Sequence, residues 1–301
     1  MAEYIIGVDA GGTKTTAEGY TLTGESLGSE AGGFGNTTVD FDRGLANICE
    51  TVDRLLAKLG DGCAYLCVGC AGIETGDLKP RAQKLLSERY PFPVFVTNDA
   101  MLGLYAALEG RDGVLVIAGT GSIGYLKQGE ALRRCGGWGH LINDDGSGYT
   151  IAVRAIRKIA DAFDTGPGRE DTPLKRSVFA HLGITELRQL IDFTYRSTKG
   201  EIASLVPVVE AVADSGDAEA REILEWAGEC LAKIAVRLCK QNGYTKHPNI
   251  AISGSVIRKT AITREVFCGR LTAELGEYAL YDRDFNPTSG GYYLYREQYP
   301  S

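Results

Sequence analysis

Apolar and polar residues alternate in three short runs near the start of the chain, at positions 4–9, 15–22 and 25–31. Turns that contain glycine separate these runs, a pattern that is typical of strands in an antiparallel meander. From Asp40 to Leu59 the apolar residues instead recur every three or four positions, which predicts a helix with one buried face. The chain is therefore expected to begin with a small sheet followed by a helix.

Strand and helix patterns then alternate. A strand runs through Cys67, a helical segment spans Arg81 to Arg89, and a second apolar strand ends just before Asn98. This alternation is typical of an α/β domain.

The second half of the chain begins as the first half does. A buried strand at Gly113–Ala118 leads into a glycine-rich turn with a threonine, and return strands are expected at 122–127 and 130–134. A long amphipathic helix over Ala218–Lys240 and a last strand at 249–256, before another helix, follow later. We interpret the two halves as a weak duplication of architecture rather than of sequence.

The turn in this second half contains the spacing G-x-G-x-x-G at Gly119, Gly121 and Gly124. In a dinucleotide-binding fold these glycines must lead into a helix whose N-terminus meets the pyrophosphate. Here an alternating pattern with a turn at Gln128-Gly129 follows instead. The sequence therefore predicts a hairpin and not a dehydrogenase.

Composition and charge narrow the class of protein. A chain of 301 residues with 44% apolar and 24% charged residues can bury a large core, and two domains are expected. The N-terminus is acidic and reaches Asp9 after a short apolar segment, which predicts neither a signal peptide nor a membrane span and hence a cytoplasmic protein. A net charge of -7 without a basic run argues against a nucleic-acid partner. Any bound phosphate must then be held by backbone amides and a metal.

Eight cysteines occur, and Cys63, Cys67 and Cys70 have a spacing that would suit three ligands of an iron–sulfur cluster. They lie in an apolar run that predicts a buried strand, in which Cys70 faces away from Cys63 and Cys67 because their positions differ in parity. The core interpretation is therefore favoured over a cluster. The other five cysteines are scattered, which suits a reducing compartment.

The turn DAGGTKT, Asp9 to Thr15, nearly matches a Walker loop, but Thr13 separates Gly12 from Lys14. Consecutive glycines let backbone N–H groups approach a phosphate, and the Thr13 hydroxyl adds a donor. Asp9 at the strand end is placed to hold a hydrated Mg²⁺. Taken alone, a glycine hairpin with a solvated Asp9 explains the turn equally well.

A second turn of the same kind, AGTGS at Ala118–Ser122, favours the phosphate-binding interpretation over the plain hairpin. Two such strand–turn–strand loops that face each other would clamp the phosphates of a nucleotide from both sides. A third segment, ISGSV at Ile252–Val256, places glycine and serine between a strand and a helix, where a backbone can pack against adenosine.

In this order the three segments resemble the phosphate-1, phosphate-2 and adenosine motifs of the actin-like ATPase and sugar-kinase fold. The chain is most similar to the N-acetylglucosamine kinase branch of the BadF/BadG/BcrA/BcrD ATPase family, nearly end to end. The most specific portions are CGGWGHLINDDGSGY at Cys135–Tyr149, TNDA at Thr97–Ala100, GNTT at Gly35–Thr38 and ADSGD at Ala213–Asp217.

The resemblance implies an α/β, two-lobed actin-like ATPase (ribonuclease H-like) fold with a central mixed sheet in each lobe. The expected N-terminal lobe is 1–109, completed by the C-terminal segment 287–301, and the expected C-terminal lobe is 110–286. The lobes are expected to close around ATP and sugar, because an exposed phosphoryl group would be lost to water.

Asp99 is the predicted catalytic base, because a carboxylate just after a strand projects into a cleft where it can accept a proton from a sugar hydroxyl. The alternative is that Asp99 only caps a helix that starts near Ala100. The residues alone favour the cap, and the resemblance reverses that order.

The resemblance also assigns the remaining site residues. It implies Asn36, Asp99, Ser122, Gly137, Trp138, Gly139 and Asp144 for the sugar, and Gly11, Gly12, Thr13, Lys14, Thr120, Gly121, Ala213, Gly254 and Ser255 for ATP, with Asp9 for Mg²⁺.

The GGWGH segment places backbone polar groups and an indole close together in the sequence. This combination suits a sugar, because a sugar ring is neutral and has both hydroxyl groups and an apolar face. The alternative for Trp138 is a buried core aromatic. The three histidines, His140, His181 and His247, have no metal-like spacing and are interpreted as structural or solvated.

Two features depart from the resemblance. Ile123 stands where animal N-acetylglucosamine kinases have a polar residue, so a hydrogen bond to the sugar is expected to be lost or moved. Tyr292 and Tyr293 stand where small residues usually follow the glycine pair, which is expected to alter the packing of the last helix.

The function that this resemblance implies is transfer of the ATP γ-phosphoryl group to the 6-hydroxyl of N-acetylglucosamine or a close relative, N-acetylmuramic acid or glucosamine, by a homodimer. One alternative is an ATPase activator of a 2-hydroxyacyl-CoA dehydratase or benzoyl-CoA reductase, which needs interface cysteines for a cluster. A non-catalytic sugar sensor is a third, although such a protein would need a DNA-reading extension. The ROK sugar kinases have a C-x-C-G-x-x-G-C zinc segment that this sequence lacks.

Overall fold

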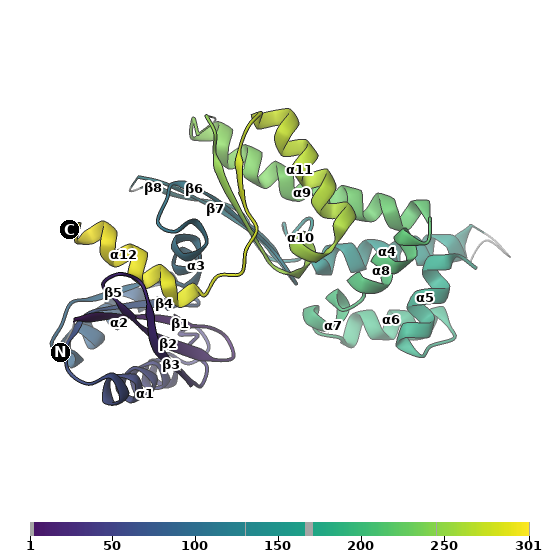
Figure 1. The fold of residues 1–301 in the computed structure, drawn as a ribbon. Helices are drawn as coiled ribbons and strands as arrows, with labels where there is room; N and C mark the ends of the chain where they lie inside the picture. Colours follow the sequence, from purple (N-terminus) through teal and green to yellow (C-terminus); the bar gives the residue numbers. More distant parts are fainter. Residues whose placement is uncertain (1–2, 130, 166–170, 245, 301) are drawn as a thin grey trace. The chain divides into compact units, whose positions relative to one another are not determined.

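The protein is described here from a computed structural model, which covers residues 3–129, 131–165, 171–244 and 246–300. It divides into two compact units: unit 1 is Met1–Asp112 with Arg283–Ser301, and unit 2 is Gly113–Asp282. Each unit is built on one five-stranded sheet that contains both parallel and antiparallel pairs (Figure 1). The expected α/β class, with a central mixed sheet in each lobe, is confirmed.

The sheet of unit 1 has the strand order β3-β2-β1-β4-β5. Strands β1, β2 and β3 pair antiparallel, which confirms the predicted meander, whereas β4 and β5 run parallel to β1. The bounds are β1 Tyr4–Ala10, β2 Thr15–Thr21, β3 Ser26–Gly32, β4 Cys63–Cys70 and β5 Val94–Asn98.

Helices cover both faces of this sheet. One apolar cluster joins β1 and β4 to α1 (Phe41–Leu59) and α2 (Leu78–Arg89). The other joins them to α3 (Asp99–Leu108) and α12 (Gly290–Gln298). Helix α1 forms where the sequence predicts it: the Asp40 side chain accepts from the N–H of Arg43 at 3.0 Å, and Ile48, Val52 and Leu55 are buried along one stripe.

The end of the chain packs against the middle of unit 1 through glycine. A Cβ added to Gly7 would lie 1.9 Å from the carbonyl oxygen of Thr288, and one added to Gly290 would lie 2.0 Å from that of Leu102. Tyr292 is buried in the cluster beside α3, and Tyr293 packs against it. The two tyrosines that depart from the family pattern are therefore core side chains that seat the last helix.

The cysteine strand β4 is buried as predicted, but one detail of the prediction is wrong. Tyr4 pairs with Cys63 while Ile5 pairs with Tyr65, so a bulge lies at the start of β4. The extra residue moves Cys63 to the face of Cys70, and Cys67 belongs to the cluster on the other face. Burial raises the pKa of Cys63 to about 12 and that of Cys70 to about 11, as expected for thiols in a core.

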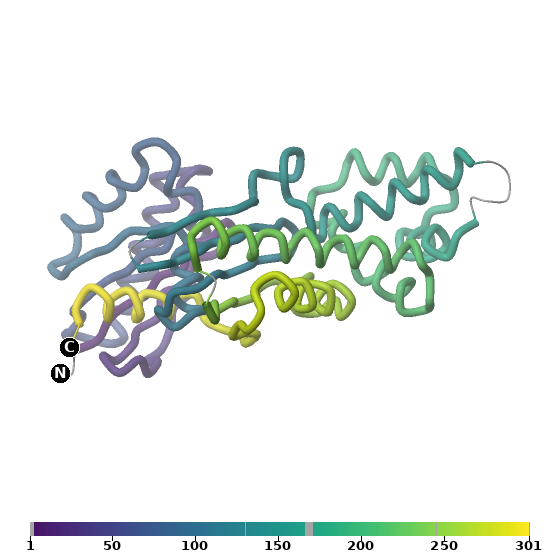
Figure 2. The backbone as a smooth tube through the Cα atoms, turned by 90° about the horizontal axis from the view of Figure 1, so that it is seen from above, coloured from purple at the N-terminus to yellow at the C-terminus, as the bar shows by residue number. Residues whose placement is uncertain are grey.

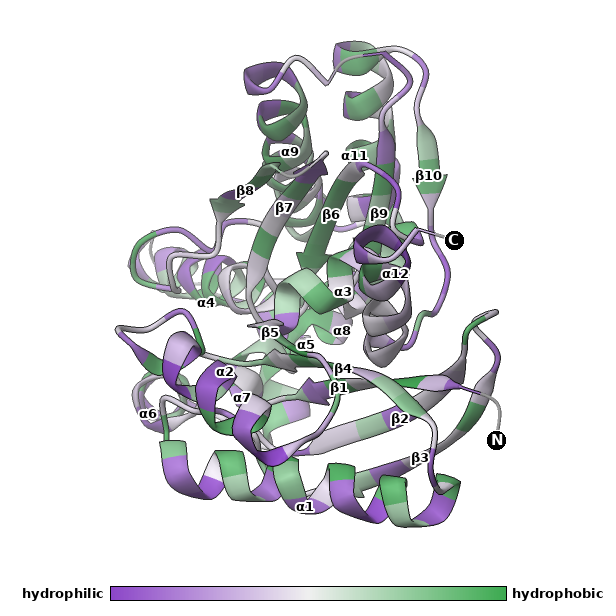
Figure 3. Cartoon of the chain, turned by 90° about the vertical axis from the view of Figure 1, so that its left-hand side faces the viewer, coloured by the Kyte–Doolittle hydropathy of each residue, from purple (hydrophilic) through white to green (hydrophobic). Residues whose placement is uncertain are grey.

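Unit 2 repeats the strand arrangement of unit 1. Its sheet has the order β10-β9-β6-β7-β8, in which β6, β7 and β8 form the antiparallel part and β9 and β10 run parallel to β6. The bounds are β6 Gly113–Ala118, β7 Ser122–Gln128, β8 Ala131–Gly136, β9 Asn249–Ser253 and β10 Ala279–Tyr281. The predicted hairpin after the glycine fingerprint and the predicted duplication of architecture are both confirmed. Figure 3 shows the central strand β6 as mostly hydrophobic.

The helices of unit 2 pack against that sheet and against each other. Figure 2 shows α9 and α11 side by side, and a Cβ added to Gly228 in α9 would lie 2.5 Å from the carbonyl oxygen of Thr263 in α11. In the part of the chain that is described, no helix has the length and apolarity needed to span a bilayer. The bounds are α4 Gly148–Asp164, α5 Pro173–Leu182, α6 Leu187–Arg196, α7 Lys199–Ala203, α8 Val206–Asp214, α9 Ala218–Gln241, α10 Ser255–Lys259 and α11 Ala261–Leu275.

Because the backbone of Gly290 lies so close to that of Leu102, adding a single methyl group there is expected to reduce the stability of the fold. Gly290→Ala places a Cβ against a backbone carbonyl that cannot turn away, so we expect it to lower the free energy of unfolding by about 1–3 kcal/mol. Urea denaturation measures this directly. Gly103→Ala, in the facing helix α3, is the control: its Cβ meets nothing within 4 Å, and alanine is the better helix former by about 0.5–1 kcal/mol. Equal losses in both variants would contradict the steric explanation.

Candidate active site

In unit 1 the carboxyl ends of three parallel strands meet at one edge of the sheet. Ala10 at the end of β1 pairs with Cys70 of β4, and Cys70 pairs with Asn98 of β5. Asp9 and Asp99 flank this row, so two carboxylates from distant parts of the sequence lie at the same edge. Both side chains are half-buried.

The predicted phosphate-1 turn leaves this edge from the end of β1. The N–H of Gly11 donates to the carbonyl oxygen of Lys14 at 2.9 Å, which closes the turn into β2. Gly12, Thr13 and Lys14 are exposed at its tip, and a Cβ added to Gly12 would meet nothing within 4 Å. The tip is therefore open to a ligand.

The loop that carries Asn36 is tied to the same edge. The N–H of Gly35 donates to the carbonyl oxygen of Gly11 at 2.9 Å, and the N–H of Thr37 donates to that of Ala71 at 3.3 Å. The Asn36 side-chain oxygen accepts from the N–H and the hydroxyl of Thr38, at 2.9 and 2.6 Å. These bonds fix the Asn36 amide and leave its NH₂ group for other partners.

Asp99 is the first residue of α3, but another residue caps that helix. The side chain of Asn98 accepts from the N–H of Met101 at 2.6 Å and is the N-cap. The Asp99 carboxylate accepts from backbone N–H groups at the start of the helix, that of Ala100 at 2.9 Å and its own. The interpretation of Asp99 as the helix cap is therefore wrong, and its carboxylate is available for chemistry.

Burial raises the pKa of both carboxyl groups at this edge. For Asp99 burial is the main cause, and the hydrogen bond from Ala100 opposes it. For Asp9 burial comes first, the negative charge of Asp99 raises the pKa further, and Lys14 lowers it. Two carboxylates that influence each other in a partly dry environment are typical of sites that bind cations or move protons.

In unit 2 the predicted phosphate-2 turn is tied to the start of α4. The N–H of Gly119 donates to the carbonyl oxygen of Gly121 at 3.0 Å within the turn. The N–H groups of Gly148 and Tyr149 donate to the carbonyl oxygens of Gly119 and Thr120, at 2.7 and 3.2 Å. The turn therefore has a fixed position at the N-terminus of a helix.

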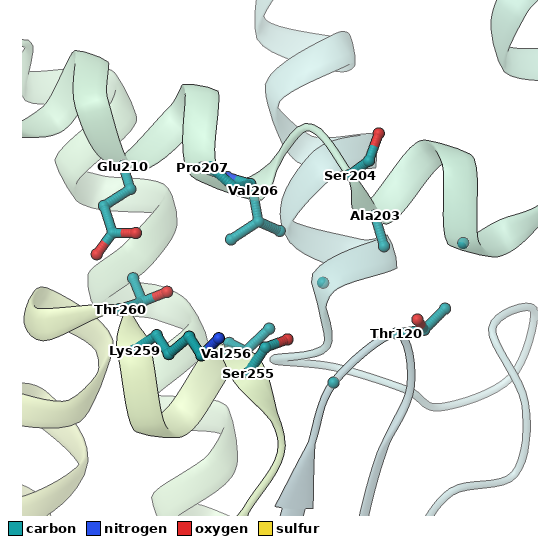
Figure 4. A pocket seen from close by; sticks show the side chains of 13 residues that line it. Thr120, Ala203, Ser204, Val206, Pro207, Glu210, Ser255, Val256, Lys259 and Thr260 are labelled. Atoms are coloured by element: carbon teal, nitrogen blue, oxygen red, sulfur yellow. The ribbon is translucent and has the colours of Figure 1, made fainter.

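A cavity of about 340 Å³ in unit 2 begins at this turn (Figure 4). Thr120 and Ser255, two of the predicted ATP residues, line it, and Gly254 precedes Ser255 with a φ of 94° and no room for a Cβ beside Ala118. Gly148 and Val256 also line it and lie within motif segments, although they are not among the predicted ATP residues. Sequence reasoning missed the rest of the lining, because it comes from segments without a motif: Gly200, Ala203, Ser204, Val206, Pro207, Glu210, Lys259 and Thr260.

One predicted ATP residue lies elsewhere. Ala213 is 2% exposed in the core of unit 2 and is not among the residues that line the cavity. It lies on α8 three residues beyond Glu210, which does line the cavity. The Ala213 side chain therefore contributes to the packing of α8 in the core.

The predicted sugar loop follows β8. Gly137 and Gly139 both have positive φ angles, 68° and 97°, which place Trp138 between two bends that favour glycine. The side chain of Arg134 donates to the carbonyl oxygens of Gly136 and Gly137, and its guanidinium lies 4.2 Å from the centre of the Trp138 ring. Trp138 is 58% exposed, so the alternative of a buried core aromatic is wrong.

Ile123 has a structural role beneath this loop. A Cβ added to Gly137 would lie 2.5 Å from Ile123 Cδ1. The isoleucine side chain therefore packs against the backbone of Gly137 and supports the conformation of the loop. A polar side chain at this position would replace an apolar contact.

The far end of the loop carries a buried carboxylate. Asp144 is 5% exposed, and a Cβ added to Gly121 in the phosphate-2 turn would lie 3.3 Å from Asp144 Oδ2. Ser122, also buried, donates its hydroxyl to the carbonyl oxygen of Asp145 at 2.9 Å. Among the described residues no hydrogen bond is found to the Asp144 carboxylate. Its oxygens are not among the fully buried polar atoms that lack a partner, so the carboxylate remains accessible to water or to a ligand.

Comparison with known proteins agrees with this picture. The profile of the BadF/BadG/BcrA/BcrD ATPase family matches residues 6–268. N-acetylmuramic acid/N-acetylglucosamine kinase of Clostridium acetobutylicum is 36% identical, over 75% of this chain and 76% of that protein. N-acetyl-D-glucosamine kinase of Dictyostelium discoideum is 28% identical, over 85% of this chain and 86% of that protein.

A crystal structure of a candidate N-acetylglucosamine kinase from Chromobacterium violaceum is similar along nearly the whole chain. The two proteins are 26% identical, the TM-score is 0.72, and the match covers 97% of this chain and 98% of the other. The similarity thus extends beyond the sequence motifs to the arrangement of the elements. Because the family profile spans most of the sequence, the chain belongs to the BadF/BadG/BcrA/BcrD ATPase family.

Proposed function

We propose that this protein is an ATP-dependent kinase that transfers the γ-phosphoryl group to the 6-hydroxyl of an amino sugar. The substrate class is N-acetylglucosamine with its close relatives N-acetylmuramic acid and glucosamine. The family supports the use of ATP, and the names of the relatives support the sugar class. The observation that carries the proposal is the Asp99 carboxylate, which is half-buried beside the phosphate-1 turn and is not needed as a helix cap.

Asp99 acts as the general base. It accepts the proton of the sugar hydroxyl as that oxygen attacks the γ-phosphorus and the bond to the β-phosphate oxygen breaks. A raised pKa makes the carboxylate a stronger base than an exposed aspartate. The remaining catalysis consists of alignment and charge neutralisation.

The two glycine turns hold the phosphates. In unit 1 the backbone N–H of Gly12, the Thr13 hydroxyl and the Lys14 ammonium group lie at an open tip, whereas the N–H of Gly11 closes the turn onto the carbonyl oxygen of Lys14. In unit 2 Thr120 and Gly121 present the corresponding turn, which α4 keeps in place. Backbone amides in such turns bind anions without a basic patch, as the net charge of -7 requires.

Asp9, with Asp99 beside it, fits a hydrated Mg²⁺. This ion is usually held by one or two carboxylates together with substrate phosphates rather than by a full protein cage. When bound there it would neutralise charge on the triphosphate. The raised pKa of Asp9 supports this assignment, because a nearby cation would relieve the repulsion between the two carboxylates.

The cavity of about 340 Å³ receives the nucleoside. Figure 4 shows Thr120 near one end and Glu210 toward the other, with Ser255 and Val256 facing Val206 across the space between them. The phosphates then lie at the Thr120 end, and the ribose and base lie between α8 and α10. The sugar loop supplies Trp138 for an apolar ring face and Asp144 for hydroxyl groups.

Replacing the proposed base separates chemistry from binding. Asp99→Asn keeps the shape of the side chain and the cap of α3, so we expect the protein to fold and to bind sugar in calorimetry. Its kcat should fall by about 10²–10⁴, measured by coupled ADP release with N-acetylglucosamine. The control is Asp77→Asn, an exposed aspartate before α2 that makes no capping bond. Full activity of Asp99→Asn would remove this residue from its role.

The pH profile provides a second test of Asp99. The base must be ionised to accept a proton, and burial raises its pKa above the ordinary value of 3.8. Activity should therefore be lost on acidification at a higher pH than an exposed aspartate would give, and recover as the pH rises through the raised pKa. A pH series of kcat/KM measures this. An acid limb at the ordinary aspartate value would argue against a buried base.

The nucleoside cavity can be narrowed selectively. Ser255→Phe adds a ring at the cavity wall, so the KM for ATP should rise about ten-fold or more, because roughly 1.4 kcal/mol of binding energy corresponds to a factor of ten. The KM for the sugar should change little. Ser87→Phe, at an exposed position of α2 in unit 1 and outside the cavity, is the control. A rise in the KM for sugar alone would place the nucleotide elsewhere.

A further inference from the structure

A second cavity of unit 2, of about 310 Å³, lies between the sugar loop and helices α4 and α9. It adjoins a smaller one of about 210 Å³, because Arg154 and Arg157 of α4 line both. One side of it is the segment His140–Asp145 of the sugar loop motif, whereas Arg154, Arg157 and Trp226 belong to no motif and to none of the proposed phosphate and nucleoside positions. It begins at Asp144, the buried carboxylate of the sugar loop.

Its wall carries two arginines whose charges are not neutralised by a neighbour. Arg154 lies with its guanidinium 3.5 Å from the centre of the Trp226 ring. In the described parts of the chain, neither Arg154 nor Arg157 has a carboxylate within ion-pair distance. Lys158, beside Arg157, differs: it pairs with Glu219 at 3.5 Å and Glu222 at 3.2 Å. The two guanidinium groups are therefore available to an anion.

The remaining wall combines aromatic and apolar side chains with four polar ones, Asn143, Asp144, Asp145 and Thr150. The rings of His140 and Tyr149 meet edge to face at 4.9 Å, and Val153 lies on the same face of α4 as Arg154 and Arg157. The carboxylates in the wall belong to Asp144, next to Gly121, and to Asp145, whose backbone accepts from Ser122. A cation-bearing cavity with partly apolar walls suits a carboxylate on a short carbon side chain, since guanidinium pairs with it in a forked geometry.

The cavity is continuous with the loop that we propose for the sugar. The Thr150 hydroxyl donates to the carbonyl oxygen of Asp144 at 3.2 Å, which joins the first turn of α4 to the loop. Arg154 and Arg157 follow on the same face, about 6 and 10 Å further along the helix axis. Helical side chains lean toward the N-terminus, so both arginines extend back toward the loop.

We propose that this cavity is a subsite for the carboxylate of an anionic amino sugar, namely the 3-O-lactyl group of N-acetylmuramic acid. Arg157 and Arg154 bind the carboxylate, and the aromatic wall contacts the methyl-bearing carbon. The inference rests on the proposed amino-sugar kinase function and assigns recognition residues to N-acetylmuramic acid, one of the sugars of that proposed substrate class. It agrees with the name of the relative that is 36% identical.

The test compares the two sugars. The purified full-length protein and its Arg157→Gln variant are assayed by ADP release with N-acetylglucosamine, N-acetylmuramic acid and the methyl ester of N-acetylmuramic acid. We expect Arg157→Gln to lower the ratio of kcat/KM for N-acetylmuramic acid to that for N-acetylglucosamine by about ten-fold or more, as for loss of a charged hydrogen bond. The ester, which lacks the charge, should not respond to the variant.

Two further variants separate charge from structure. Lys158→Gln removes a cation from the same helix whose charge is already neutralised, and it should leave the ratio unchanged. Arg157→Lys should restore part of the ratio, because it restores the charge. Melting temperatures verify that the variants are folded, which is expected because Arg157 is exposed.

The outcomes also distinguish this inference from the proposed function. Phosphorylation of N-acetylglucosamine without N-acetylmuramic acid would overturn the subsite and leave the kinase proposal intact. An unchanged ratio in Arg157→Gln, or an equal response of the ester and the acid, would likewise overturn the subsite. Absence of phosphorylation of every amino sugar would overturn the proposed function, and the subsite with it.

Discussion

The pairing of three parallel strand ends in unit 1 is the constraint on which the proposed chemistry depends. Ala10, Cys70 and Asn98 are in register in the parallel ladder. This pairing holds Asp9 and Asp99, which flank the row, at the same edge of the sheet. The loop with Asn36 is then tied to the same row through Gly11 and Ala71. The parallel ladder therefore brings together four segments that are up to 89 residues apart, from Asp9 to Asn98. Burial at this edge is the main cause of the raised pKa of both carboxyl groups, and for Asp9 the negative charge of Asp99 raises the pKa further.

The two units share one strand order but differ in the side chains at the ends of their central strands. Strand β1 carries a carboxylate one residue before its end, at Asp9, whereas the equivalent position of β6 is Ile117. Unit 1 therefore has two carboxylates at its edge, whereas the edge of unit 2 continues into a cavity lined by hydroxyls, backbone, apolar side chains and the charged residues Glu210 and Lys259. In the proposed mechanism the same topology serves a cation and a proton in one unit and the nucleoside in the other.

Periodicity predicted most of the fold, because the helices and strands of this chain bury clear stripes. It failed where the outcome depended on a single backbone irregularity or on a contact between distant segments. The bulge beside Cys63 moves its side chain to the opposite face of the sheet, and no local sequence pattern predicts it. The choice of Asn98 over Asp99 as the helix cap depends on one backbone position, since both residue types are good caps. The cavity residues on α7, α8 and α10 are ordinary helix positions until the helices meet.

The contact of Arg134 with the sugar loop has a consequence for recognition. Its guanidinium is bonded to two carbonyl oxygens of the loop and lies over the Trp138 ring, while the indole remains open to solvent. The loop is thus ordered by folding itself and not by the arriving molecule. A preorganised loop loses less conformational entropy when a ligand binds. It therefore selects ligands that fit its existing shape rather than changing shape to fit them. A ring that matches the indole surface is then distinguished from one that does not at the first encounter.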